Sequence, residues 1–155
     1  MKGKKNKKIV FVCTGNTCRS PMAVCIFKKM LKEKKVAENF VVHSAGINAG
    51  NNLPMNDNAI KALKTLNIPV LQHSSMRVEE NDILESNIVI TMTTEQKEFL
   101  SNYKNVYSIK QLAKSEDILD PFGEDFECYL KVCQRLIKDL NKILNLLVEE
   151  NDISC

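Results

Sequence analysis

Residues 12–23 read VCTGNTCRSPMA, and within them a thiol, Cys13, stands six positions before a guanidinium, Arg19. The run that leads into this stretch is KIVFVC at 8–13, which is β-branched, aromatic and apolar after its first lysine. Short runs of this kind are typical of strands that are buried on both faces of a sheet. The sequence therefore predicts a buried strand that ends at Cys13, with a short loop directly after it.

A helix is expected to begin where this loop ends. Ser20 is a favourable N-cap, and Pro21 suits the first helical position because an N–H there would have no helical partner. Apolar residues then recur at helical spacing as far as about Lys35. They are Met22, Ala23, Ile26, Phe27, Met30 and Leu31.

The rest of the chain continues this alternation of elements. Further strands are expected at 39–45, 87–92 and 105–109, and further helices at 57–67, 93–102 and 126–147. Strands that alternate with helices form parallel βαβ units. We therefore predict an α/β fold in a single domain, with a four-stranded parallel sheet and helices on both faces. Ligands bind beyond the carboxyl ends of such strands, where the loop after Cys13 is expected.

Length and composition limit the classes of function. A chain of 155 residues fits one domain, 1–155, that can bury a sizeable core. The net charge of +3 is mild, and much of it comes from residues 1–7, which we interpret as a flexible basic tail. With no Trp and few Phe and Tyr, the chain offers no aromatic platform for nucleic-acid bases.

The cysteines and the absence of a long apolar run indicate the compartment. The apolar run after the basic tail is too short for a secretory signal or a membrane span. The six cysteines are then expected to be reduced thiols in a cytoplasmic protein. We expect a monomer, without nucleic-acid or membrane partners.

The loop after the first strand has the composition of an oxyanion site. A strand, a Gly-containing loop and a helix start direct backbone N–H groups and the positive end of the helix dipole at one point. Arg19 can close this ring with a planar, bidentate fork on phosphate oxygens. The same donors stabilise Cys13 as a thiolate. These groups predict attack of sulfur on phosphorus, a phosphocysteine intermediate and hydrolysis by water, with no metal or cofactor.

A proton donor for the leaving group is expected near the long last helix. Asp120 precedes Pro121 in a turn-forming stretch and is flanked by apolar Leu119 and Phe122. An apolar environment favours the protonated carboxyl. We therefore interpret Asp120 as the general acid.

Four motifs now carry a resemblance to a known family. VCTGNTCRSPMA, SAG at 44–46, LQHSS at 71–75 and DPFG at 120–123 resemble the low-molecular-weight protein-tyrosine phosphatases in order and spacing. The resemblance covers the chain apart from its Lys-rich tail. It implies a cytoplasmic phosphatase that acts on phosphorylated proteins and releases inorganic phosphate.

The resemblance also implies roles for single residues. Cys13 would be the nucleophile, Arg19 the phosphate clamp, and Asp120 the acid that later activates water as a base. Ser20 would hydrogen-bond the sulfur, and Asn16 would adopt the left-handed conformation within a network that includes Ser44 and His73. The residues implied to bind phosphate or substrate are Thr14, Gly15, Asn16, Thr17, Cys18, Ser20 and Phe122.

Two departures from the tyrosine-specific members resemble the protein arginine phosphatases of the family. Those members carry a branched aliphatic residue where this chain has Thr17, and paired aromatics where it has Phe122 and a glycine. A phosphorylated guanidinium carries N–H donors that an aliphatic wall would leave unpaired, whereas the Thr17 hydroxyl can accept from them. We therefore predict a phosphoarginine phosphatase, with a tyrosine phosphatase as the alternative. Met76 and Arg77 depart from the expected pattern at the pocket rim.

The sequence argues against three other functions. A thioredoxin-coupled arsenate reductase needs a relay pair of cysteines in the middle of the chain, and there is none between Cys25 and Cys128. A zinc module would use Cys13/Cys18 and Cys128/Cys133, but five residues turn a helix by about 500°, so the second pair would face different directions. A phospho-binding module without turnover would keep the loop but lose the acid or the nucleophile, and this chain has both.

The sequence leaves two roles open for Cys18. It lies five residues after the nucleophile and either packs the loop or traps oxidised Cys13 as a reversible disulfide. The family resemblance favours the disulfide.

Overall fold

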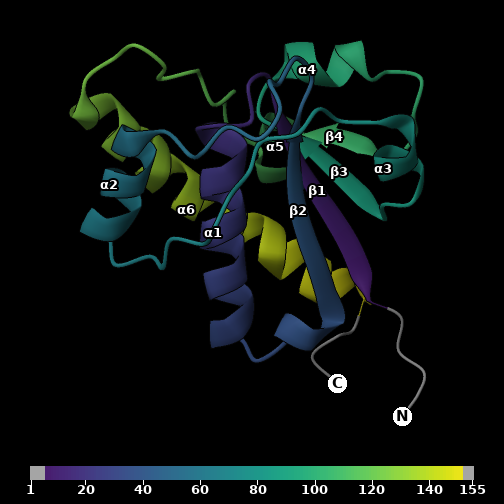
Figure 1. Cartoon of the computed structure of the whole chain (residues 1–155). Helices are drawn as coiled ribbons and strands as arrows, with labels where there is room; N and C mark the ends of the chain where they lie inside the picture. Colours follow the sequence, from purple (N-terminus) through teal and green to yellow (C-terminus); the bar gives the residue numbers. More distant parts are fainter. Residues whose placement is uncertain (1–5, 152–155) are drawn as a thin grey trace.

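The computed structural model describes residues 6–151 and contains one parallel sheet. Its strands are β1 (Lys7–Cys13), β2 (Phe40–Gly46), β3 (Ile88–Thr91) and β4 (Val106–Ser108). The sheet order is β2-β1-β3-β4, and every neighbouring pair is parallel (Figure 1). Each end of the four predicted strands lies within one residue of the observed one. The predicted fold class is confirmed, and Cys13 ends one of the two inner strands.

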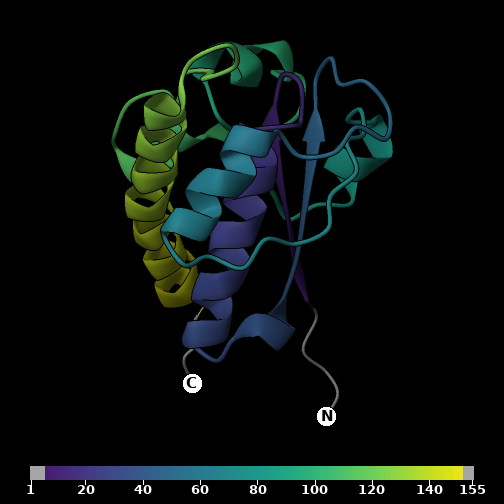
Figure 2. The same cartoon turned by 60° about the vertical axis from the view of Figure 1, so that its left-hand side comes forward.

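Helices cover both faces of the sheet. One face carries α1 (Arg19–Glu33), α2 (Asp57–Thr65), α5 (Ile109–Ala113) and α6 (Phe126–Asn151). In Figure 2, α1, α2 and α6 stand side by side in front of the sheet. The other face is covered around α3 (Glu80–Leu84) and α4 (Thr94–Phe99). A 3₁₀ turn, η1 (Ala37–Asn39), leads into β2.

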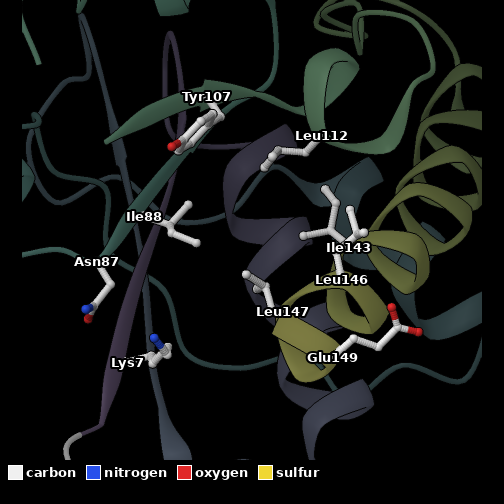
Figure 3. Close-up of a pocket in the computed structure, with 9 residues that line it drawn as sticks. All are labelled: Lys7, Asn87, Ile88, Tyr107, Leu112, Ile143, Leu146, Leu147 and Glu149. Carbon is white, nitrogen blue, oxygen red and sulfur yellow. The ribbon is translucent and has the colours of Figure 1, made fainter. Parts of the chain in front are cut away.

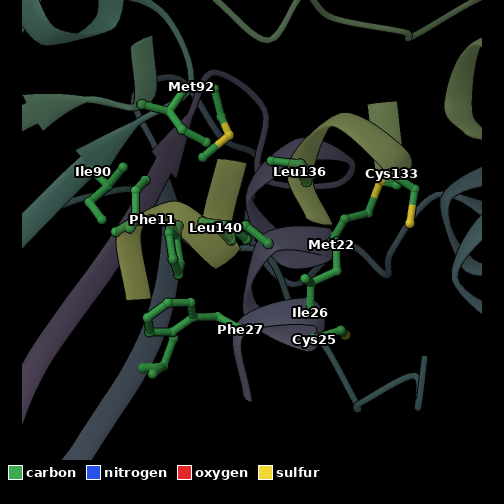
Figure 4. Close-up of a cluster of buried hydrophobic side chains, with 14 of the residues drawn as sticks. Phe11, Met22, Cys25, Ile26, Phe27, Ile90, Met92, Cys133, Leu136 and Leu140 are labelled. Atoms are coloured by element: carbon green, nitrogen blue, oxygen red, sulfur yellow. The ribbon is translucent and has the colours of Figure 1, made fainter. Parts of the chain in front are cut away.

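Alternate residues of β1 supply the two halves of the core. Ile9 and Phe11 face α1 and α6, where Phe11 meets Phe27 edge to face with ring centroids 5.6 Å apart (Figure 4). Val10 and Val12 face the opposite cluster. Each fully buried apolar side chain of this size contributes about 1.5–3 kcal/mol. Strand β1 is therefore held from both faces up to Cys13.

Several boundaries differ from the sequence predictions. Helix α1 begins at Arg19, not after Ser20, and ends at Glu33. Helices α3 and α5 were not predicted, and Ile109, taken as the end of a strand, begins α5. Helix α6 continues past residue 147 to Asn151.

The basic tail is mostly outside the described residues. Residues 1–5 lie outside that part of the chain, and Lys7, the last residue assigned to the tail, opens β1 and pairs in register with Phe40. None of the helices between residues 6 and 151 combines the length and the hydropathy that crossing a bilayer requires.

Candidate active site

The loop between β1 and α1 forms the floor of a concave cup at the carboxyl end of the sheet. The cup has a volume of about 320 Å³ and is the candidate active site. Its walls come from residues 13–19, from the segment after β2 and from the stretch that precedes α6. The lining residues are Cys13, Thr14, Gly15, Asn16, Thr17, Cys18, Arg19, Asn48, Gly50, Leu53, Asp120 and Phe122. We call residues 13–20 the cysteine loop and residues 119–123 the acid loop.

Cys13 lies at the base of the cup, with its sulfur among hydrogen-bond donors. The Ser20 hydroxyl is 2.9 Å from the Cys13 Sγ, and the backbone N–H of Asn16 donates to the same sulfur at 3.3 Å. A sulfur that carries negative charge accepts both of these bonds. The contact between Ser20 and the sulfur that the family resemblance implies is thus present.

Ser20 does not cap the helix, which corrects the sequence prediction. The N-cap of α1 is Cys18, which makes no side-chain capping bond. The hydroxyl of Ser20 is already engaged inside the cysteine loop, because it also accepts from Asn16 Nδ2 at 2.8 Å. Pro21 still lies in the first helical turn, where its missing N–H leaves no broken helical bond.

Asn16 ties the cysteine loop to the rest of the protein. Its φ of 59° is in the left-handed region, and its side chain is fully buried. Besides Ser20, its amide donates to Ser44 Oγ at 3.0 Å and accepts from the backbone N–H of Met76 at 3.0 Å. The backbone carbonyl oxygen of Asn16 lies 2.6 Å from the Nε2 of His73. Every polar group of this buried side chain is therefore satisfied, which stabilises an otherwise unfavourable backbone conformation.

Gly46, the last residue of the SAG motif, lets the cysteine loop lie close to β2. A Cβ at this position would be 2.6 Å from the Thr14 carbonyl oxygen and 2.8 Å from the Ala49 Cβ. No real side chain tolerates such distances to backbone, so only glycine fits. In the sequence, SAG stands out only by its position among the motifs, and this packing role was not predicted.

Arg19 is buried beneath the cup and makes two contacts with the opposite wall. Its Nη1 donates to the Ile118 carbonyl at 3.0 Å, and its Nη2 is 3.5 Å from Asp120 Oδ2. Its Nε is buried without a hydrogen-bond partner among the described residues. A buried, unpaired donor of a guanidinium costs free energy unless an acceptor meets it. An oxyanion in the cup would supply that acceptor.

Asp120 lies at the rim, in a more open setting than the sequence predicted. Its side chain is 52% exposed, and the neighbouring Leu119 and Phe122 are 74% and 71% exposed. The apolar enclosure expected around this carboxyl is therefore not formed, because both neighbours remain largely exposed. Instead, Asp120 Oδ1 accepts from the backbone N–H of Phe122 at 3.1 Å and Oδ2 faces Arg19.

The chain that leads into the acid loop is anchored at its base. The N–H of Ile118 donates to the Met92 carbonyl at 2.9 Å, and Asp117 Oδ1 accepts from the N–H and hydroxyl of Thr94. Further back, the Ser115 hydroxyl donates at 2.9 Å to Asp139, a buried carboxylate of α6. These bonds place Asp120 near Arg19 although its own surroundings are open.

Gln96 supports the cup and was missed by the sequence analysis. Its buried amide donates to Thr14 Oγ1 at 3.1 Å and accepts from the backbone N–H groups of Met92 and Thr93. Thr93 and Gln96 form the capping box of α4. The Thr-x-x-Gln pattern could have located that helix start, but not its reach to the cysteine loop.

Cys18 lines the cup and is buried. Its sulfur lies 3.9 Å from the Tyr129 hydroxyl and 3.8 Å from Thr17 Oγ1. Burial raises the pKa of the Cys18 thiol, although the hydrogen bonds with Thr17 and Tyr129 oppose the shift. Burial likewise raises the pKa of Tyr129 to about 12. Cys18 is accordingly a neutral thiol near pH 7, and the disulfide with Cys13 stays a prediction.

The described residues offer no obvious metal centre. Within residues 6–151, no three His, Cys, Asp or Glu side chains gather as metal ligands would. Cys133 is fully buried against the core, whereas Cys128, earlier on α6, is only half-buried. The two therefore face different environments, as the helical spacing predicted.

Comparisons with known proteins agree with the fold. Residues 8–152 match the family model described as low molecular weight phosphotyrosine protein phosphatase. The protein-arginine-phosphatase of Bacillus subtilis is 32% identical over 149 residues, covering 92% of this chain and 97% of that protein. The low molecular weight protein-tyrosine-phosphatase PtpB of Staphylococcus haemolyticus is 32% identical over 141 residues, covering 88% and 96%.

A solved structure is similar over nearly the whole chain. It is a Cys-to-Ser mutant of the YwlE arginine phosphatase with a phosphorylated active-site serine. It superimposes with a TM-score of 0.87 at 31% identity, covering 94% of this chain and 99% of that one. Together with the match to the family model, these similarities confirm the resemblance drawn from the sequence motifs. The chain belongs to the low molecular weight phosphotyrosine protein phosphatase family.

Proposed function

We propose that this protein phosphatase removes phosphate from phosphoarginine in proteins, with Cys13, Arg19 and Asp120 as its catalytic residues. The proposal on mechanism follows the contacts of the cup. The thiolate of Cys13 attacks phosphorus, and the guanidinium of Arg19 and the loop amides bind the equatorial oxygens. The P–N bond breaks as Asp120 gives its proton to the departing guanidine nitrogen.

The second half of the reaction regenerates the enzyme. Asp120, now a carboxylate, takes a proton from water as the water oxygen attacks the phosphocysteine. The P–S bond breaks, inorganic phosphate leaves, and the sulfur departs as a thiolate next to the Ser20 hydroxyl, which is 2.9 Å away. Every group in this cycle comes from the chain or the solvent, so the proposal needs no metal or cofactor.

The observation that carries the arginine preference is the Thr17 hydroxyl in the wall of the cup. Within residues 6–151 its hydrogen-bonding contact is the Cys18 sulfur at 3.8 Å, which is a weak partner. The hydroxyl therefore retains an acceptor for an N–H of the phosphorylated guanidinium. An aliphatic side chain in its place would leave that donor unpaired on binding.

The acid loop supports the same preference. Gly123 follows Phe122 with a φ of 84°, a conformation that L side chains rarely adopt. A second aromatic residue at this position would be strained, so one ring faces the cup where tyrosine-specific relatives are expected to present two. We propose that the single ring of Phe122 accommodates the slim aliphatic stem of arginine.

The test compares two phosphorylated peptides of otherwise identical sequence, one with phosphoarginine and one with phosphotyrosine. We expect the wild-type kcat/KM to favour phosphoarginine. Thr17→Ile should lower kcat/KM for phosphoarginine roughly tenfold, the effect of one lost hydrogen bond, and leave phosphotyrosine equal or better. Thr17→Ser, which keeps the hydroxyl, is the control and should retain the preference. Equal selectivity in all three proteins would show that Thr17 does not set it.

The remaining expectations of the sequence stay predictions. They are the monomeric state, the cytoplasmic location and the reversible disulfide between Cys13 and Cys18. The arsenate reductase alternative still lacks its relay cysteines, since none occurs between Cys25 and Cys128.

A further inference from the structure

A second hollow opens beside the cup. It has a volume of about 410 Å³ and shares Thr14, Arg19 and Asp120 with the lining of the cup. The hollow continues from these residues to the segment around α4. We call it the side groove. A polypeptide whose phosphorylated residue enters the cup would therefore have this groove next to it.

Part of the wall of the side groove is apolar and exposed. Phe99 is 70% exposed and Leu119 is 74% exposed, and Ile47 lines the groove together with them. Of the eight large hydrophobic side chains that are exposed among the described residues, four line either the cup or this groove. Exposed apolar side chains gathered at one place mark an interaction surface.

The groove also carries an unpaired negative charge. Glu95, at the start of α4, lines it and is exposed. No ion pair of Glu95 occurs with the residues that the structure describes. A cation on a bound chain would face this carboxylate. The groove thus combines an apolar wall with an acidic rim.

A larger hollow elsewhere provides a contrast. It has a volume of about 710 Å³ and lies between the amino-terminal ends of β1 and β3 and the last turns of α6 (Figure 3). None of its lining residues belongs to the cup. The side groove differs from this larger hollow because it is continuous with the cup.

We propose that the side groove binds the substrate protein beside its phosphorylated residue. It takes an apolar side chain within two positions of that residue against Phe99 and Leu119, and a basic side chain of the same segment against Glu95. An extended segment rises about 3.3 Å per residue, so a neighbour that close reaches a groove that shares three residues with the cup. This inference rests on the proposed protein phosphatase activity, and it does not depend on whether arginine or tyrosine is dephosphorylated.

The first experiment measures kcat/KM for short phosphopeptides that differ only beside the phosphorylated residue. Leu or Phe is compared with Gly at the two positions on each side, in both a phosphoarginine and a phosphotyrosine series. Burial of one apolar side chain is worth about 1.5 kcal/mol or more, so we expect roughly a tenfold preference for the apolar peptide at one position at least. A ratio near one at every position would overturn the inference.

Variants locate the preference in the groove. In Phe99→Ser the apolar-to-Gly ratio should fall close to one, whereas Leu84→Ser, at an exposed leucine of α3 outside the groove, should keep the wild-type ratio. An unchanged ratio in Phe99→Ser would place the preference elsewhere. Glu95→Lys should reverse a preference for a flanking Lys over a flanking Glu, and no change in that preference would remove Glu95 from the proposal.

Two further outcomes are distinguishable. If only the phosphotyrosine series is hydrolysed, the proposed arginine activity fails, and the flanking ratio still tests the groove. If light scattering shows a wild-type dimer that Phe99→Ser converts to a monomer, a second copy of this chain occupies the groove, and the substrate proposal is overturned.

Discussion

The two halves of the candidate active site are built in opposite ways. In the cysteine loop, Asn16 and Ser20 are completely buried, and their polar groups meet partners inside the protein. In the acid loop, Leu119 and Phe122 are more than two-thirds exposed, and Asp120 contacts the rest of the site through Arg19.

This difference indicates where preorganisation matters. The donors that bind a phosphoryl group must be oriented before the reaction, and a buried, satisfied network achieves this during folding. The proton donor, in contrast, must reach leaving groups of different shape. A loop that is anchored at residues 115–118 and open beyond them can do so.

The largest expected effect comes from the base of the cysteine loop. Cys13→Ser replaces the thiolate with a hydroxyl that is not ionised near pH 7, and kcat for an aryl phosphate should fall by about 10⁴-fold or more. Inorganic phosphate should still bind, because the loop amides and Arg19 remain, and calorimetry can measure this. Cys128→Ser, the same exchange on α6 outside the cup, should leave kcat unchanged. A Cys13→Ser enzyme with near-normal turnover would end the proposed mechanism.

The next effect comes from the acid loop. Asp120→Asn removes the proton donor, and kcat should fall roughly 10²-fold or more for poor leaving groups and much less for good ones. A series of aryl phosphates with graded leaving groups measures this dependence. Glu124→Gln removes a carboxylate four positions further on and should not change it. A uniform loss across the series would mean that Asp120 is not the acid.

A smaller effect separates two glycines. Gly46→Ala brings a Cβ within 2.6 Å of the Thr14 carbonyl oxygen, whereas at Gly15 the nearest atom to a Cβ, Thr17 Oγ1, is 3.9 Å away. The free energy of unfolding should fall by about 1–3 kcal/mol for Gly46→Ala and change by less than about 0.5 kcal/mol for Gly15→Ala. Urea denaturation of the two variants measures both values. Equal stabilities would show that the cysteine loop is not tightly packed on β2.

The smallest effect is expected at the base of the acid loop. Ser115→Ala removes the 2.9 Å hydrogen bond to Asp139, which should lower the free energy of unfolding by about 1 kcal/mol. Because Ile118 and Asp117 still hold the chain, kcat should change by less than about twofold, which corresponds to 0.4 kcal/mol. A kcat that falls as far as in Asp120→Asn would mean that this single bond positions the acid.

The long elements were predictable because their signals are local. The β-branched run of β1 and the six-turn apolar stripe of α6 are local patterns that indicate which residues are buried. Helices α3 and α5 have five residues each, too few for a periodic pattern. Ile109 favoured a strand by its β-branch, but the Ser108 hydroxyl accepts from the Gln111 N–H and starts a helix there.

The structure brings the predicted site residues together, whereas several of their surroundings differ from the predictions. Cys13, Arg19 and Asp120 converge as the motifs implied. The Ser20 hydroxyl contacts Cys13 and Asn16 instead of capping α1. Gly46 of β2 and Gln96 of α4 support the cysteine loop. The contacts of Gly46 and Gln96 with the cysteine loop join segments far apart in the chain, so a local sequence pattern does not show them.

The inner position of β1 has a consequence for the lifetime of the site. Paired on both edges and covered on both faces, this strand can exchange its amide hydrogens with solvent only when the whole domain opens. We therefore expect the position of the Cys13 sulfur, at the end of this strand, to be lost by global unfolding rather than by local fraying, so the floor of the cup should last as long as the fold itself.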